Sequence, residues 1–401
     1  MVKRLTAEVA IVGGGPAGLT AAIALATAGV ETALIARRPA SDHRTTALLA
    51  GSVTALNTLG AWSDCAAQAA PLRVMRLVDA TSRLVRAPEV RFAASEIGLE
   101  AFGHNIENRH LLAALNARAD ALPSLTRIED NALSVEIAPS AVTVTLNGGD
   151  SVSARLVIGA DGRRSLCRAA AGIESDSHRY SQTAMTFNLA HTRPHQDIST
   201  EFHTESGPFT LVPLPGNHSS LVCVVQPAEA ARLAALDDEA LNEELEQRSH
   251  SILGKIMAEP GRGIFPLAIE TARSFGQSRI ALIGEAAHLI PPIGAQGLNL
   301  GLRDAATIGE LVVTARHEGR DAGASDLLAR YDALRRTDVT SRTFAVDLLN
   351  RSLLSDFLPT QGARGLGLYL LERIGPLRRA VLREGVAPAA SQPRLMRGEI
   401  L

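Results

Sequence analysis

Three glycines near the N-terminus form the pattern with the clearest chemical meaning. Gly13, Gly15 and Gly18 follow an apolar run, Ala7–Val12, and open a segment with helical spacing. In a G-x-G-x-x-G loop of this kind, the first glycine makes a tight turn, the second lets the backbone approach a pyrophosphate, and the third lets the helix pack closely on the strand. The N-terminus of the helix adds free N–H groups and a positive dipole end. The pattern predicts a dinucleotide site, with Ala17 in its loop.

One part of the usual site is missing. The motif expects Asp or Glu about 20 residues later, against the ribose hydroxyls. This sequence instead has Ala36 at the end of the next predicted strand, Glu31–Ala36. Arg37 and Arg38 follow, and either faces a phosphate or stands as solvated charge at the strand end. This motif alone leaves NADP or an altered ribose contact open.

Two further motifs follow buried strands later in the chain. They are Ala160-Asp161-Gly162-x-x-Ser165-x-x-Arg168 and Gly284-Glu285-Ala286-Ala287-His288-x-x-Pro291-Pro292-x-x-x-Gln296-Gly297-Leu298-Asn299. With the glycine loop, and in this order, they resemble the flavin aromatic hydroxylases, and more closely the ubiquinone-biosynthesis hydroxylases of the UbiH/UbiF type. The resemblance covers nearly the whole chain. Its supporting pieces are Asp42–Leu48, Glu107–Leu111, Gly207-Pro208, Pro213–Pro215, Phe265–Leu267 and Pro376–Gly385.

The resemblance implies an FAD site built from all three motifs. Glu285 would accept hydrogen bonds from the ribityl or ribose side of FAD, and Asp161 would shape the pyrophosphate region. The turn from Pro292 would lead into a helix whose positive end faces the pyrimidine edge of the flavin. Arg44 and Arg109 would lie near the flavin and its phosphates, because a guanidinium suits a phosphate better than an ammonium does. The implied cofactor-binding residues are Gly13, Gly15, Ala17, Gly18, Arg37, Arg44, Arg109, Asp161, Gly284, Glu285, Pro292, Gly297, Leu298 and Asn299.

Several positions differ from the family pattern. The family usually has an acid at Ala36, Asp at Glu285, Gly at Ala295 and Trp at Cys223. Glu285 keeps the charge, but Ala36 removes a ribose contact worth about 1.5–3 kcal/mol. Ala295 places a Cβ where glycine adopts a positive φ, so we expect a slightly reset turn.

The remaining reactive side chains are predicted to be structural, and no catalytic residue is assigned; Pro292 and Arg44 are those placed nearest the flavin. His288 follows two alanines beside a turn, and we expect a packed, hydrogen-bonded histidine there. No metal site is predicted, since the other histidines lack ligand spacing: His191, His195, His203 and His218. The three cysteines are expected as reduced core residues: Cys65, Cys167 and Cys223.

Composition excludes several classes of protein. With 40 basic and 42 acidic residues among 401, the chain has no global field that would attract nucleic acid. No stretch approaches the roughly 18 apolar residues of a spanning helix. Met1 leads directly into a core strand, which predicts no signal peptide and a cytoplasmic protein. A peripheral position on the inner membrane face is the alternative that a lipid-like substrate implies.

The order of the elements predicts an α/β fold: a three-layer Rossmann-type FAD-binding domain with an inserted β-sheet substrate domain and C-terminal helices. The predicted limits are residues 1–75, 104–177 and 271–345 for the FAD-binding domain, 76–103 and 178–270 for the substrate domain, and 346–401 for the helical region.

The implied activity is that of an FAD-dependent monooxygenase. NADH or NADPH would reduce FAD transiently, and a flavin C4a-hydroperoxide would then hydroxylate an aromatic ring, that of a polyprenylated phenol in ubiquinone biosynthesis. One alternative is a flavin hydroxylase of another small aromatic or natural product; a small acid would need an anion clamp, such as Arg193 or Arg232. The other is a catalytically weak FAD-binding subunit of a biosynthetic assembly. Residues 351–385, with leucines among arginines, are expected to meet a membrane surface or a partner, or to pack on their own domain.

Overall fold

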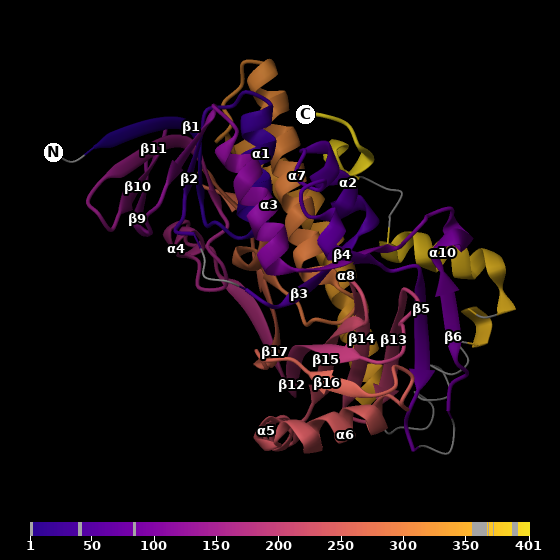
Figure 1. The fold of residues 1–401 in the computed structure, drawn as a ribbon. Coiled ribbons are helices and arrows are strands. Elements are labelled where there is room, and N and C mark those ends of the chain that lie inside the picture. The colour runs from indigo at the N-terminus through magenta and orange to yellow at the C-terminus, as the bar shows by residue number, and fades with distance from the viewer. Residues whose placement is uncertain are drawn as a thin grey trace.

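The computed structural model describes residues 3–38, 42–82, 86–354, 367, 369–371, 373–386 and 392–401. Two large sheets lie one above the other in Figure 1, and long helices run along them. The α/β fold class predicted from the sequence is confirmed. The limits predicted for the two domains stay a prediction.

The first sheet has eight strands and carries the glycine loop. Its path is β18-β19-β11-β1-β2-β8, and β10 and β9 extend it from β11. The apolar run that predicted the first strand lies at its centre, with Val9 to Val12 at most 4% exposed. The strands are β1 (Arg4–Val12), β2 (Thr32–Ile35), β8 (Leu125–Ile128), β9 (Ala132–Ile137), β10 (Val142–Leu146), β11 (Ser151–Gly159), β18 (Gly276–Gln277) and β19 (Ile280–Leu282).

Helices α1 (Pro16–Thr27), α3 (Asn108–Asp120) and α7 (Gln296–His317) pack together beside this sheet (Figure 1). Helix α1 begins at Pro16, a residue suited to the first helical position because its missing N–H would have no partner there. Its buried alanines let α7 approach closely, so the loop at the start of α1 and the turn at the start of α7 come near each other.

The second sheet has nine strands, in the path β20-β17-β12-β15-β14-β13-β5-β6, with β16 beside β12. Strand β12 alone spans 17 residues and runs through much of this sheet. Apolar residues of α5 (Pro227–Ala235) and α6 (Asp238–Arg248) cover one face (Figure 1). The strands are β5 (Val74–Asp79), β6 (Val90–Ala93), β12 (Ser175–His191), β13 (Ile198–Thr204), β14 (Gly207–Leu214), β15 (His218–Val225), β16 (Ile256–Ala258), β17 (Gly263–Ala272) and β20 (His288–Leu289).

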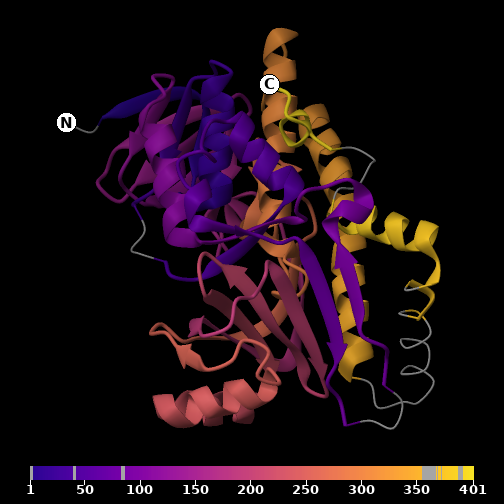
Figure 2. The ribbon, with the colours of Figure 1, turned by 45° about the vertical axis from the view of Figure 1, so that its right-hand side comes forward.

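The C-terminal part links the two sheets. Helix α8 (Ser325–Leu354) contacts β18 and β19 of the first sheet and β14 of the second (Figure 2). Helix α10 (Gly375–Val386) lies beside β5 and β6 in both views. Of the apolar residues expected to form a surface stripe, Phe357, Leu358, Leu366 and Leu368 lie outside the described residues.

The remaining elements are shorter. A three-stranded sheet holds β3 (Thr45–Leu49), β7 (Gly103–Glu107) and β4 (Ala69–Pro71); the other helices are α2 (Ala50–Thr58), α4 (Leu166–Ala170), η1 (Ala66–Gln68), η2 (Ala94–Ile97), η3 (Gly284–Ala286) and η4 (Arg394–Arg397). None of the helices in the described ranges is long and apolar enough to cross a membrane.

Candidate active site

The three glycines of the loop meet different surroundings. A Cβ at Gly13, whose φ is +117°, would lie 2.1 Å from the carbonyl oxygen of Ala160, and a Cβ at Gly18 would lie 2.1 Å from that of Gly13. A Cβ at Gly15 would meet nothing within 4 Å. Gly15 also caps α1 without a side-chain hydrogen bond, so no side chain of the cap occupies the first N–H groups of the helix. The outer glycines therefore serve packing, and the middle one leaves room for a ligand.

The end of β2 offers no carboxylate to a ribose. The Cβ of Ala36 lies 2.7 Å from where a Cβ on Gly14 would stand, so this position does border the loop. Arg38 forms ion pairs with Asp120 (3.0 Å) and Glu129 (2.9 Å) and serves as strand-end charge. The side chain of Arg37 is 63% exposed and 3.7 Å from Asp130.

The second motif joins the first sheet to the third motif. The carboxylate of Asp161 accepts hydrogen bonds from Ser165 Oγ (2.6 Å) and from the backbone N–H of Cys167 (3.1 Å). Arg168 donates to the carbonyl oxygen of Ala286 (2.9 Å) and to Glu270 (3.1 Å). The side chain of Asp161 thus shapes the loop next to Gly13 and is occupied by protein groups.

The third motif presents one free carboxylate. The backbone N–H of Gly284 donates to Asp304 Oδ2 (3.0 Å), which fixes the turn after β19. Glu285 follows with an exposed side chain, for which the described part of the chain supplies no hydrogen bond or ion pair. The pKa of Arg44 is raised, mainly by its hydrogen bond to Asp42 and to a smaller extent by the charge of Glu285, so these groups share one region.

The turn into α7 keeps a left-handed residue. Ala295 has φ 55° and ψ 30°, so the left-handed conformation accommodates its Cβ, and the slight reset expected of this turn stays a prediction. Asn299 then holds the start of α7 in place. Its amide donates to the carbonyl oxygens of Ala47 (2.8 Å) and Ala295 (2.6 Å), and its oxygen accepts from Leu49 N (2.8 Å) and Ser52 Oγ (2.7 Å). Only the backbone of Asn299 is left to meet a cofactor.

A cavity of about 490 Å³ opens between the two sheets. It brings together four of the predicted site residues: Arg44, Glu285, Pro292 and Leu298. The second sheet contributes a mainly apolar wall: Ala184, Thr186, Val222, Phe265, Pro266, Leu267 and Ala268. The cavity also touches Pro16, directly after the glycine loop. Arg109 pairs with Glu107 (2.9 Å) and does not line it.

Sequence reasoning missed Asp42 and Asn108, which both line the cavity. Asp42 accepts two hydrogen bonds from the side chain of Arg44 (2.9 and 2.8 Å) and one from Asn108 (2.9 Å). Burial would raise the pKa of Asp42, but the hydrogen bonds from Arg44 and Asn108 outweigh it and lower that pKa. Asn108 stands directly before Arg109 in the motif Glu107–Leu111, and the part that Arg109 plays in binding the cofactor stays a prediction.

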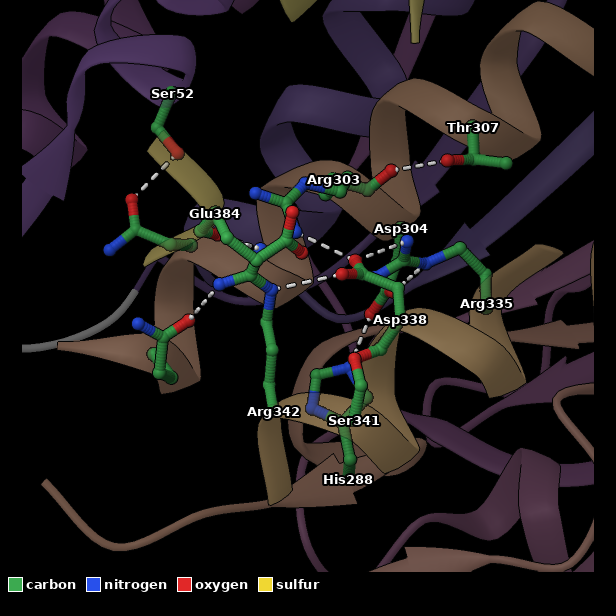
Figure 3. A network of polar contacts seen from close by, with 12 residues as sticks. Ser52, His288, Arg303, Asp304, Thr307, Arg335, Asp338, Ser341, Arg342 and Glu384 are labelled. Carbon is green, nitrogen blue, oxygen red and sulfur yellow. Dashed lines mark hydrogen bonds and ion pairs between the residues drawn. The ribbon is translucent and has the colours of Figure 1, made fainter. Parts of the chain in front are cut away.

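His288 is packed and hydrogen-bonded, as expected (Figure 3). Its Nε2 lies 2.6 Å from Asp304 Oδ2, and both side chains are 1% exposed. The cysteines are also buried, and all three are free thiols, as predicted.

Comparison with known proteins identifies the family of this chain. The family model of the FAD binding domain (FAD_binding_3) matches residues 6–344. The chain belongs to the FAD-dependent monooxygenases. Ubiquinone hydroxylase UbiL of Rhodospirillum rubrum is 37% identical, over 98% of this chain and 93% of that protein. The 3-demethoxyubiquinol 3-hydroxylase of Escherichia coli is 32% identical, over 94% of this chain and 97% of that protein. The resemblance inferred from the motifs is confirmed.

Solved structures agree with this fold. The p-nitrophenol 4-monooxygenase PnpA of Pseudomonas putida superposes with a TM-score of 0.79 at 18% identity, covering 97% of this chain and all (100%) of that one. PqsL of Pseudomonas aeruginosa, described as a probable FAD-dependent monooxygenase, gives a TM-score of 0.76 at 19% identity, covering 91% and 99% of the two chains.

The residues present fit FAD. The space above Gly15 and the uncapped start of α1 suit a pyrophosphate, and the unpaired Glu285 suits hydroxyl groups. The cavity between Pro292 and Phe265 continues from this region and has the apolar wall that a flavin ring and an aromatic substrate need.

Proposed function

We propose that this monooxygenase hydroxylates the aromatic ring of a polyprenylated ubiquinone precursor, with O2 and either NADH or NADPH. The observation that carries the proposal is the cavity in which Glu285 and Pro292 of the third motif face apolar residues of β17, among them Phe265 and Leu267. The names of the relatives supply the substrate class.

Bound FAD supplies the electron transfer and oxygen chemistry of such a reaction. The protein binds and orients it. Gly15 and the start of α1 bind the pyrophosphate, Glu285 accepts hydrogen bonds from hydroxyl groups, and the positive end of α7 stabilises negative charge on the ring. Phe265 and Leu267 hold the substrate ring and exclude water from it.

The test is oxidation of NADH or NADPH by the purified protein, with and without a polyprenylated phenol, followed by mass spectrometry of the phenol. We expect substrate-stimulated oxidation and a product heavier by one oxygen atom. A yellow protein that oxidises the nicotinamide equally with and without the phenol, and leaves the phenol unchanged, would contradict the proposed substrate. The assignment of FAD as the cofactor would still stand.

Arginines that could have clamped a small acid are engaged elsewhere. Arg193 donates to the carbonyl oxygen of Ser251, and Arg232 pairs with Glu229 (2.8 Å) and Glu244 (3.2 Å). Neither lines the cavity. Arg44 and Arg163 do line the cavity, but each pairs with a carboxylate, Asp42 (2.8 Å) and Glu270 (3.3 Å). These contacts favour an uncharged ring over a small aromatic acid.

We further propose that α10 contacts an anionic membrane surface from which the substrate is taken. Leu377 and Val381, four residues apart on α10, are exposed, as is Ile374 just before the helix. Arg379 and Arg383 are exposed on the same helix. Exposed apolar and basic side chains on one helix suit a surface of anionic headgroups, with about 1 kcal/mol from each basic residue near the surface.

Liposome flotation tests this contact. Arg378 is a poor target, because it donates to Glu96 (2.8 Å) and lies 4.5 Å from the ring centroid of Phe92. The variant is therefore Arg379→Glu/Arg383→Glu, with Arg378→Lys as the control. We expect wild type and control to float with anionic vesicles, and the double variant to stay behind. If wild type stays behind as well, the helix does not bind membranes.

A further inference from the structure

Five charged side chains form a buried cluster on α7 and α8 (Figure 3). We call Arg303, Asp304, Arg335, Asp338 and Arg342 the arginine cluster. Asp304 accepts from Arg335 Nε (2.6 Å), and Asp338 accepts from Arg335 Nη1 (2.8 Å). Asp338 also accepts from Arg303 Nη1 (2.7 Å) and from Arg342 Nε (2.9 Å).

The arginine cluster carries excess positive charge. Three guanidiniums face two carboxylates, and no side chain among them is more than 17% exposed. Burial would raise the pKa of each carboxyl group, but the neighbouring charges outweigh it: those of His288 and Arg335 for Asp304, and those of Arg303 and Arg335 for Asp338. Both aspartates are therefore ionised at neutral pH, and one positive charge is left over.

Arg342 connects this charge to the turn beside the cavity. Its Nη1 lies 3.3 Å from Oε1 of Gln296, the first residue of α7. The amide nitrogen of Gln296 in turn donates to the carbonyl oxygen of Gly294 (2.9 Å), two residues after Pro292. Arg342 thus reaches the turn through one side chain.

The guanidinium of Arg342 is held from the opposite side by α10. It donates to the carbonyl oxygens of Gly385 (3.2 Å) and Glu384 (3.0 Å) in the last turn of that helix. The last carbonyls of a helix generally lack partners within it, so a cation suits them. Together with the bond to Asp338, they fix the position of the charge, which is what an electrostatic role requires.

We propose that Arg342 is a positioning residue for the flavin: it holds the turn before α7 through Gln296 and places the excess charge of the arginine cluster behind that turn. This inference rests on the FAD site proposed above. A reduced flavin gains negative charge at its pyrimidine edge, and a fixed positive charge near the start of α7 favours that form over the oxidised one. Loss of the charge should therefore make the midpoint potential of bound FAD more negative.

The test compares two substitutions at Arg342 with a matched control. Arg342→Gln removes the charge, and Arg342→Lys keeps it. Arg336→Gln is the control, because Arg336 also lies on α8, pairs with a carboxylate four residues earlier (Asp332, 2.8 Å) and donates to a backbone carbonyl, that of Arg273 (2.6 Å). The midpoint potential of bound FAD is measured by spectroelectrochemical reduction, and thermal unfolding of the FAD-free proteins reports structural damage.

We expect a more negative potential for Arg342→Gln only, with Arg342→Lys and Arg336→Gln close to wild type. An unchanged potential in Arg342→Gln, even with lower thermal stability, would overturn the proposal and leave Arg342 as a link to α10. An equal fall in Arg342→Lys would overturn the role of charge. If Arg342→Gln does not fold, Gln296→Glu neutralises the same charge, and an unchanged potential there overturns the proposal too. A wild-type protein that takes up no FAD would instead refute the FAD site itself.

Discussion

At the scale of single residues, a substitution at Gly15 should affect FAD binding without affecting the stability of the fold. Its φ of −72° and ψ of 175° are open to any residue, and a Cβ there meets no protein atom within 4 Å. We expect Gly15→Val to abolish FAD binding, because its side chain fills the pyrophosphate space, and to leave the melting temperature of the FAD-free protein unchanged. Gly18→Val is the contrast: its Cβ would lie 2.1 Å from a backbone oxygen and should destabilise the fold. Full flavin content in Gly15→Val would show that the loop is misassigned.

Ala36 offers the opposite experiment, a gain of binding. It stands beside the loop, where the family usually has an acid for the ribose hydroxyls. Ala36→Glu should tighten FAD by about 1.5–3 kcal/mol, the usual worth of a charged hydrogen bond. Titration of the FAD-free protein with FAD measures this, and Ala36→Gln separates the charge from the added length. Unchanged or weaker affinity in Ala36→Glu would mean that another group already serves the ribose.

The thiols should be inert in the native enzyme. Burial raises the pKa of Cys65 and of Cys223 to about 11, and that of Cys167 well above its ordinary value. Since the thiolate is the reactive form, at pH 8 only about 0.1% of a thiol with such a pKa is available. A chromogenic disulfide reagent should react slowly with the native protein. After unfolding, it should react rapidly with all 3 cysteines. Rapid release of one equivalent from the native protein would contradict the burial of that cysteine.

At the scale of elements, the start of α7 stores strain at Ala295. A left-handed conformation costs a non-glycine residue roughly 1–2 kcal/mol. Replacement by glycine removes this cost, but it also stabilises the unfolded chain by making it more flexible, which offsets part of the gain. Ala295→Gly should therefore raise the free energy of unfolding by about 0.5–1 kcal/mol, measured by urea denaturation. Gln296→Gly, one residue inside the helix, should lower it. A lower stability of Ala295→Gly would indicate that the Cβ makes a favourable contact.

Local spacing was enough to predict the first strand, turn and helix, and long-range contacts explain what it missed elsewhere. The strand, turn and helix around Gly13 depend on neighbours in the sequence, and they form as expected. The role of Asn299 depends on Ala47, Leu49 and Ser52, about 250 residues earlier, and no local pattern reveals such partners. The same holds for Asp42, whose partner Asn108 is 66 positions away. The motifs thus located the site, but the contacts of its individual side chains could be assigned only from the three-dimensional structure.

At the scale of the whole molecule, Asp304 of α7 connects the turn at Gly284, the second sheet and helix α8. This carboxylate accepts from the N–H of Gly284 in the turn, from His288 at the edge of the second sheet, and from Arg335 of α8. One buried group therefore stabilises contacts among the first sheet, the second sheet and the linking helix. The loss of one partner from a buried ion pair costs about 3–5 kcal/mol.

Acid should expose the contribution of Asp304 to this assembly. Its pKa in the folded protein is lowered from 3.8; burial opposes the shift, but the charges of His288 and Arg335 outweigh it. The stability it contributes is therefore complete well above pH 3.8 and is lost as the pH falls through the folded value. We expect Asp304→Asn to unfold at lower urea concentration than wild type at pH 7, and this gap to narrow below about pH 4. Asp326→Asn, at an aspartate 71% exposed in the first turn of α8, should match wild type throughout. A gap of equal size at pH 7 and pH 2 would show that Asn fails through its shape, and that the charge of Asp304 does not stabilise the junction.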